Sequence, residues 1–214
     1  NIYVLNSPIL SNAQFEKFLK FFGNNNKVLD CTFSKDDDLE TSINLLKVKS
    51  EQAVREGIKQ IILSDKNISE NRMPMPMLLC IGAINTHLVK LGLRGYVSIN
   101  VQTGDALDTH SFATLIGVGA TTVNPYLAFD SLYQRHSKKL FGNFTFDECV
   151  SRYIKSVNLG LLKIMSKMGI SVLSSYRGGC NFETVGLSRT IVKDYFPGML
   201  SKISGIGLKG IEKK

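Results

Sequence analysis

The sequence predicts an α/β domain in which a parallel sheet of about five or six strands is flanked by helices. Helical apolar patterns alternate along the chain with short apolar runs rich in β-branched residues. A glycine separates helix from strand in most of these units, at the point where only glycine enters the left-handed conformation cheaply. Strands that alternate with helices favour a parallel sheet with right-handed crossovers. The strands are too few for a complete eight-stranded barrel.

The individual elements follow from local patterns. In the first unit, Leu39, Ile43 and Leu46 recur at helical spacing, and Gly57 precedes an apolar strand. Pro76 can open the second helix at its first turn, and Gly92 ends it. The expected helices cover residues 39–54, 76–91, 108–117 and 147–168. Strands are expected at residues 61–63, 96–101, 121–123 and 170–173, and residues 31–33 are expected to end a further, earlier strand. Surface loops are expected at residues 24–26, 35–38, 66–72 and 134–146.

The last of these units carries the strongest pattern. Tyr153, Val157 and Leu161 share one face of the longest expected helix, and Gly169 stands at its expected C-cap. The run from Ile170 to Leu173 is apolar and β-branched enough to form a strand buried on both faces. The residues that follow it would then lie at the carboxyl end of a strand, where parallel α/β folds place their sites.

Length and composition predict a single domain that covers residues 1–214. The chain begins at Asn1 rather than Met, and both of its ends are interpreted as excision points from a longer protein. The formal net charge of +8 comes from lysines spread along the chain, which favours a solvated surface over nucleic-acid binding. No apolar run approaches the ~20 residues that span a bilayer, so no membrane partner is expected.

The cysteines give no sign of a metal site. Cys31, Cys80, Cys149 and Cys180 are widely spaced and form no C-x-x-C pair. Cys80 and Cys149 fall within helical apolar patterns and are interpreted as small core residues. A reducing intracellular compartment is therefore expected, and no targeting segment is recognised in this piece.

Polar residues follow each expected strand. They are Ser64-Asp65, Gln102 to Asp105, Asn124-Pro125, and Ser174 to Gly179. Because the carboxyl ends of parallel strands share one edge, these residues could build a pocket with two carboxylates, amides and one arginine. The favoured interpretation is that Asp65, Asp105 and Ser174 cap helices or turns. A face toward a partner domain and a self-sufficient active site are the alternatives.

The segment from Tyr176 to Gly179 could also bind phosphate through backbone N–H groups and the Arg177 guanidinium. It lacks the lysine and the length of a P-loop. A structural ion pair or a contact between domains is therefore favoured for Arg177.

The three histidines could act as acid–base groups. No G-x-S-x-G nucleophile motif accompanies His87, His110 or His136. His87 shares a helix face with apolar residues and is interpreted as a buried or interface histidine. His110 is expected to pair with Asp108 or Asp105.

Four ordered motifs resemble the central domain of the glutamate synthase large subunit. They are Asn6 to Leu10, Ile62 to Asp65, Gly119-Ala120 with Val123 to Phe129, and residues 165–187, which include Ser175-Tyr176-Arg177-Gly178. The resemblance covers nearly the whole chain. In that family the central domain is an incomplete relative of the flavin-binding barrel that follows it, so an incomplete TIM-barrel-like sheet is implied here.

The resemblance implies a part of an oxidoreductase of glutamate biosynthesis and ammonia assimilation. Glutamate synthase releases ammonia from glutamine in an amidotransferase domain, adds it to 2-oxoglutarate, and reduces the product at FMN while an iron–sulfur cluster relays electrons. These sites belong to flanking domains, so no catalytic residue, cofactor or metal is expected in this segment. Either a reduced nicotinamide or ferredoxin could supply the electrons, in the cytoplasm or in a plastid-like organelle.

The role that the resemblance implies is structural. A connecting domain would position the amidotransferase and FMN-binding synthase domains and help wall the ammonia path, because a reactive amine must be kept from water between sites. The candidate domain-interface residues are Ser175, Tyr176, Arg177, Gly178 and Asn124. The alternative is a stand-alone small-molecule binding or enzyme domain with a pocket at the carboxyl ends of the strands.

The sequence departs from the family pattern at several polar positions. Asn85-Thr86-His87 stands where relatives tend to carry three histidines, and Gln102 to Asp105 stands where they tend to have Glu-Ser-Gly-Glu. Ser111 takes the place of the second histidine of a usual pair, and Gly179-Cys180 takes the place of Ala-Gln. These differences leave the apolar framework of the fold intact.

Overall fold

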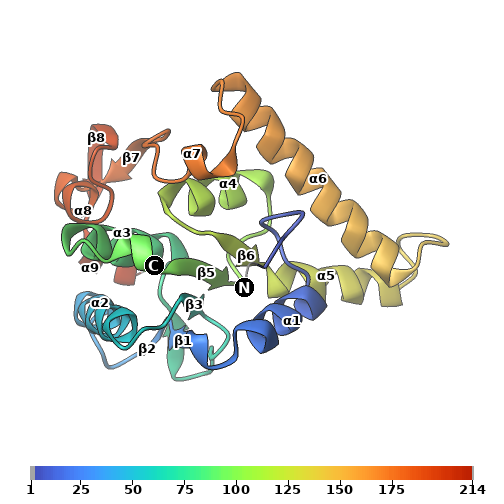
Figure 1. Ribbon diagram of the computed structural model, residues 1–214, viewed down its shortest axis with the longest axis horizontal. Coiled ribbons are helices and arrows are strands. Elements are labelled where there is room, and N and C mark those ends of the chain that lie inside the picture. Colours follow the sequence, from blue (N-terminus) through green and yellow to red (C-terminus); the bar gives the residue numbers. More distant parts are fainter. Residues whose placement is uncertain (1–2, 214) are drawn as a thin grey trace.

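A computed structural model describes residues 3–213 of the chain. It confirms the α/β class, because parallel strands form the main sheet in the order β1-β3-β5-β6 and helices surround them (Figure 1). These strands are β1 (Asn26–Asp30), β3 (Gln60–Ser64), β5 (Ser98–Gln102) and β6 (Thr122–Asn124). Within residues 3–213 this sheet has four strands and stays open. Asn1, on which the expectation of an excised segment partly rests, lies outside the described residues.

Each connection between neighbouring strands of the main sheet contains one long helix. These helices are α2 (Leu39–Arg55), α3 (Met77–Lys90) and α4 (Thr109–Val118), close to their expected bounds. Asp38 caps α2 by accepting from the Thr41 N–H, and Asp108 caps α4 by accepting from the Ser111 N–H. Gly57, after α2, has a φ of 92°, which confirms the predicted left-handed stop.

The remaining elements surround this core. They are α1 (Asn12–Phe22), η1 (Gly23–Asn25), β2 (Thr32–Ser34), β4 (Arg72–Pro74), η2 (Arg94–Tyr96), α5 (Tyr126–Ser137), α6 (Phe146–Lys167), α7 (Leu173–Tyr176), β7 (Glu183–Leu187), α8 (Arg189–Tyr195), β8 (Leu200–Ile206) and α9 (Leu208–Glu212). Strands β2 and β4 pair antiparallel, and β7 and β8 form a separate parallel pair. Among residues 3–213, no helix is both long and apolar enough to cross a membrane.

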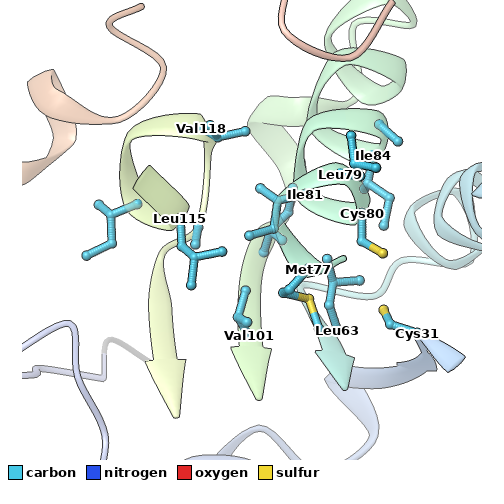
Figure 2. Packing of buried hydrophobic residues seen from close by; sticks show 14 of the residues in the cluster. Cys31, Leu63, Met77, Leu79, Cys80, Ile81, Ile84, Val101, Leu115 and Val118 are labelled. Atoms are coloured by element: carbon cyan, nitrogen blue, oxygen red, sulfur yellow. The ribbon is translucent and has the colours of Figure 1, made fainter. Parts of the chain in front are cut away.

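The larger hydrophobic core lies between the main sheet and α2, α3 and α4. Figure 2 shows Leu63 and Val101 projecting from their strands toward α3, where Met77 and Ile81 lie. Cys80 is fully buried on the same helix, as predicted for a small core residue. Because alternate residues of a strand point to opposite faces, Ile62 lies on the other side of β3 and packs against α1.

That second face of the sheet is largely polar. The Asn100 amide on β5 donates to Gln60 Oε1 over 2.9 Å, and its Oδ1 accepts from the Thr122 hydroxyl over 2.8 Å. These bonds run across three neighbouring strands and satisfy the side chains of Asn100 and Thr122, which are almost completely buried. A buried polar row of this kind is tolerable because its members are hydrogen-bonded to one another.

The N-terminal segment covers the open edge of β6. Ile9 forms a parallel bridge with Val123, and the Leu10 N–H donates to the Val123 carbonyl over 2.9 Å. The Val123 N–H donates in turn to the Pro8 carbonyl over 2.8 Å. Residues 8–10 therefore occupy the position that a further strand would take beside β6.

The expected strand at residues 170–173 is not formed. Helix α6 ends at Lys167, Gly169 adopts a φ of 70°, and α7 already begins at Leu173. The edge where this strand would pair is occupied by residues 8–10, and the Val172 side chain is 52% exposed. Two apolar residues of this run, Ile170 and Leu173, still pack against the main core.

Two other boundaries differ from expectation. The predicted basic loop at residues 134–146 begins later, because α5 continues to Ser137 before the turn. The strand expected to end at residues 31–33 is divided at Cys31 into β1 and β2. Cys31 sits at this corner with its N–H bonded to the Ser64 carbonyl over 2.8 Å, so the chain leaves the main sheet and pairs with β4.

Candidate functional site

The predicted amides do meet at the carboxyl edge of the sheet. Ser64, Gln102 and Asn124 stand in register on neighbouring strands. The Ser64 hydroxyl donates to Gln102 Oε1 over 2.9 Å, and Gln102 Nε2 donates to Asn124 Oδ1 over 3.2 Å. Asn124 Nδ2 then donates to the Leu10 carbonyl and to Asn12 Oδ1. These side chains bond to one another and fasten the N-terminal segment.

The two carboxylates at this edge also have partners within the chain. Asp65 accepts from the Thr103 hydroxyl and from the Gly104 N–H over 3.1 Å. Burial raises the pKa of Asp65 above its usual value, although these hydrogen bonds oppose the shift. Asp105 accepts from the Met77 N–H at the start of α3 over 3.4 Å. The Asp105 contact agrees with the favoured capping interpretation, whereas Asp65 instead holds the loop that follows β5.

Arg177 does not join these carboxylates, so the pocket considered as an alternative is not formed around it. Its Nη1 donates over 3.3 Å to the hydroxyl of Thr121, the residue directly before β6. Asn124 is the last residue of the same strand. Arg177 therefore lies at the amino edge of the sheet, because residues 170–173 form no strand that would carry it to the carboxyl edge. Ser174 is exposed on α7, an element that follows a helix rather than a strand.

The candidate interface residues differ in their exposure. Tyr176 is completely buried, and its hydroxyl donates to the Ala113 carbonyl of α4 over 3.2 Å. Asn124 is also completely buried. Ser175 and Gly178 are exposed, and Arg177 is half-buried. Two of the five side chains are thus committed to the interior of this chain.

Gly178 combines a left-handed backbone with a close backbone contact. Its φ is 73°, a conformation that residues with a Cβ rarely adopt. Its N–H donates to the Gly117 carbonyl over 2.7 Å, so the backbones of the turn and of α4 approach closely. This contact places Arg177 over the end of α4.

A cavity of about 590 Å³ opens at this amino edge. Arg94 on η2 and Arg177 both line it, together with the ends of α3 and α4. Arg94 was not singled out from the sequence. It donates to Asn85 Oδ1 over 2.7 Å, to the Val97 carbonyl over 2.6 Å and to the Gly119 carbonyl over 3.0 Å. Burial, and then the nearby Arg177, lowers the pKa of Arg94 to about 10.

Some of the family departures gather around this cavity. Asn85, Thr86 and Cys180 all line it. Gln102 belongs instead to the row at the carboxyl edge, and Ser111 lies in the first turn of α4. The cavity therefore combines two guanidinium groups with three of the positions that the resemblance marks as departures.

The histidines are engaged in local contacts. His87 Nε2 lies 2.9 Å from Glu51 Oε2 on α2, and the half-buried ring fits the interface form of the expected buried or interface histidine. The His110 ring packs edge-on against Phe182 with centroids 6.4 Å apart, while Asp108, one of its two expected partners, caps Ser111. His136 Nε2 lies 2.9 Å from the Phe144 carbonyl. Within residues 3–213, no group of three or more His, Cys, Asp or Glu residues could hold a metal ion.

The fold and these contacts define an open parallel α/β domain that uses most of its buried polar groups to hold itself together. The glutamate synthase central domain family matches residues 1–188. The chain therefore belongs to this family.

Its relatives are much longer proteins. The glutamate synthase [NADPH] large chain of Azospirillum brasilense is 47% identical over 98% of this chain, and that of Bacillus subtilis (strain 168) is 41% identical over 98%. The chloroplastic ferredoxin-dependent glutamate synthase of Oryza sativa subsp. japonica is 39% identical over 95%. The chain spans about 14% of the length of these relatives.

Solved structures offer a weaker similarity. A flavocytochrome b2 with sulfite bound superposes with a TM-score of 0.47 and 14% identity, over 87% of this chain and 44% of that chain.

Proposed function

We propose that this chain is the connecting domain of a glutamate synthase, one folding unit over residues 1–214 that positions flanking amidotransferase and FMN-binding domains. It would help wall the path along which ammonia moves from glutamine toward 2-oxoglutarate, since a reactive amine must be kept from water between sites. Membership of the family and the small share of its relatives' length support this proposal. FMN and an iron–sulfur cluster would belong to the flanking domains, and the isolated chain would be inactive.

The observation that carries the proposal is the uncovered face of the β7–β8 pair. Val185 on β7 is 63% exposed, and Leu200 and Ile203 on β8 are 56% and 61% exposed. Parallel strands are normally covered on both faces by other elements. An apolar parallel pair open to solvent therefore fits a surface that another domain covers. Ser175, Arg177 and Gly178 lie on the segment that leads to β7 and are the proposed neighbours of that contact.

The compartment follows from the same proposal. A bacterial parent enzyme would work in the cytoplasm, and a eukaryotic one in a plastid-like organelle. The second function considered, a stand-alone binding domain at the carboxyl edge of the sheet, gains no support from the geometry, because the side chains there are bonded to one another.

The test uses the complete enzyme that contains this domain. Val185→Glu should lower the ratio of glutamate formed to glutamine consumed, because a charge would be placed in the contact with the flanking domain. Val48→Glu is the matched control, since Val48 is a 59% exposed valine on α2. Equal ratios for both variants and the unchanged enzyme would contradict the proposal.

A further inference from the structure

Two half-buried cations face one cavity without an acid between them. Arg94 and Arg177 line the 590 Å³ cavity, and they are close enough for Arg177 to lower the pKa of Arg94. No aspartate or glutamate appears among the residues that line it. In the described part of the chain, the ion pairs of arginine are those of Arg55 and Arg72, so neither cavity arginine has a carboxylate partner.

The two arginines use their donors differently. Arg94 is held by three hydrogen bonds, to Asn85, Val97 and Gly119, and so provides a fixed positive charge. Arg177 makes one longer bond, of 3.3 Å, to Thr121. Its Nε is buried and has no partner among residues 3–213. A guanidinium with unused donors beside a fixed cation is an arrangement that an anion would complete.

The energetics point the same way. A buried charge is costly unless it is paired, and two like charges in one cavity raise that cost. An oxyanion would remove both penalties, because a planar guanidinium matches carboxylate or phosphate oxygens with two parallel N–H bonds. Lys90 at the rim would add a further positive charge.

The walls suggest what kind of anion fits. Val118, Phe196 and Met199 provide apolar surface. The Thr86 hydroxyl also lines the cavity, but its hydrogen is already donated to the Tyr195 carbonyl over 3.1 Å. A volume of this size, mostly apolar with a few convergent polar groups, is typical of small-molecule sites. Inorganic phosphate alone would leave the apolar walls unused.

We propose that this cavity binds a small organic oxyanion, a carboxylate or phosphate ester with an apolar body, through Arg177, while Arg94 supplies a fixed countercharge. The site lies at the amino edge of the sheet, opposite the edge where α/β domains usually carry their sites. The inference does not depend on the proposed connecting role, because it concerns groups within this chain alone.

The experiment titrates the purified 214-residue chain with phenyl phosphate, succinate and inorganic phosphate at matched ionic strength. Calorimetry should show saturable binding of at least one organic probe, tighter than that of inorganic phosphate. Arg177→Ala should weaken it by about tenfold or more, and Arg177→Lys by less, because lysine keeps the charge and loses the fork. Arg135→Ala, an exposed arginine on α5, is the matched control and should bind like the unchanged chain.

Two further readouts separate ligand binding from a structural role. Without a ligand, Arg177→Ala should be as stable as the unchanged chain or more stable, because it removes a like charge and an unpaired donor. In the unchanged chain, the Nε–H NMR signal of Arg177 should move when the organic probe is added. The proposal is overturned if no probe binds the folded chain, if Arg177→Ala binds equally well, or if that signal stays in place at saturation. Each result concerns the isolated chain, so it is distinct from a failure of the coupling test on Val185.

Discussion

Gly82 and Phe196 touch where α3 packs against α8. A Cβ placed on Gly82 would lie 2.5 Å from Phe196 Cε1 and 2.8 Å from the carbonyl oxygen of Tyr195. The family match ends at residue 188, so Phe196 belongs to the segment that follows it. This contact packs the segment after residue 188 directly against α3, which belongs to the matched domain. The close approach is possible because residue 82 has no side chain.

Gly82→Ala is therefore expected to destabilise the chain by about 1–3 kcal/mol, the usual cost of forcing extra atoms into a packed core. Urea unfolding followed by circular dichroism measures the change. Gly95→Ala is the control, because a Cβ there meets nothing within 4 Å. Equal midpoints for the two variants would show that α8 does not pack on α3 this closely in solution.

Tyr176 is expected to stabilise the chain from inside. Tyr176→Phe removes the hydroxyl that donates to the Ala113 carbonyl and should cost about 1 kcal/mol. Tyr176→Ala removes a buried ring and should cost about 3–5 kcal/mol. Tyr96→Phe, at a tyrosine that is 65% exposed, should change the free energy of unfolding little. If Tyr176→Ala were as stable as Tyr96→Phe, Tyr176 would have to be a surface residue after all.

Asp65 should make the stability of the chain depend on pH. Burial raises the pKa of Asp65 above 3.8 in the folded chain, so the folded state holds this proton more tightly than the unfolded state. Between pH 3.8 and the raised pKa, the folded chain binds more protons at this site. The contribution of Asp65 to the free energy of unfolding therefore decreases as pH rises across that interval. Above the raised pKa, where Asp65 is ionised in both states, the full destabilisation is present.

Asp65→Asn removes the titrating group and keeps an oxygen that can accept from Thr103. As pH rises across the same interval, the free energy of unfolding of Asp65→Asn should therefore increase relative to that of the unchanged chain. Denaturant unfolding at a series of pH values gives the difference between the two proteins. Asp36→Asn, at an exposed loop aspartate, serves as the reference. Parallel curves for Asp65→Asn and the unchanged chain would rule out this coupling.

The isolated chain is expected to leave the fluorescence of micromolar FMN unchanged. In the part of the chain that the structure describes, the Arg177 turn is the phosphate-binding candidate from the sequence, and it lacks the form of a P-loop. Tyr195, Phe196 and Pro197 line the neighbouring cavity, which is proposed above for a much smaller oxyanion than FMN. Stoichiometric quenching of the flavin would show that this domain holds FMN itself.

Local signals predicted those elements whose causes are local. The helix ending before Gly57 and the capped start of α4 at Asp108 each depend on residues within a few positions of the boundary. The strand expected at residues 170–173 failed for a non-local reason, because the segment with Ile9 already pairs with β6. A run of apolar, β-branched residues cannot reveal that its place in the sheet is taken.

The candidate site divides in the same way. The row of Ser64, Gln102 and Asn124 could be predicted, since each residue follows an apolar strand and parallel strands align their ends. The approach of Arg94 to Arg177 could not be predicted, because two connections that are distant in the sequence meet at the amino edge of the sheet. Arg94 stands in a short helix-to-strand connection, and no motif around it marks it as a ligand group.

The contact between the N-terminal segment and β6 also constrains the order of events during synthesis. Leu10 receives the Asn124 amide across a separation of 114 residues, so a growing chain emerges from the ribosome with this segment unpaired. Helices α2, α3 and α4 can pack on the first strands while it waits, because their connections are local. Until β6 is released, the segment with Ile9 and Leu10 lacks its strand partner Val123, and its backbone groups are open to chaperones. The last step in closing this edge thus belongs to a segment that is made 114 residues before its partner Asn124.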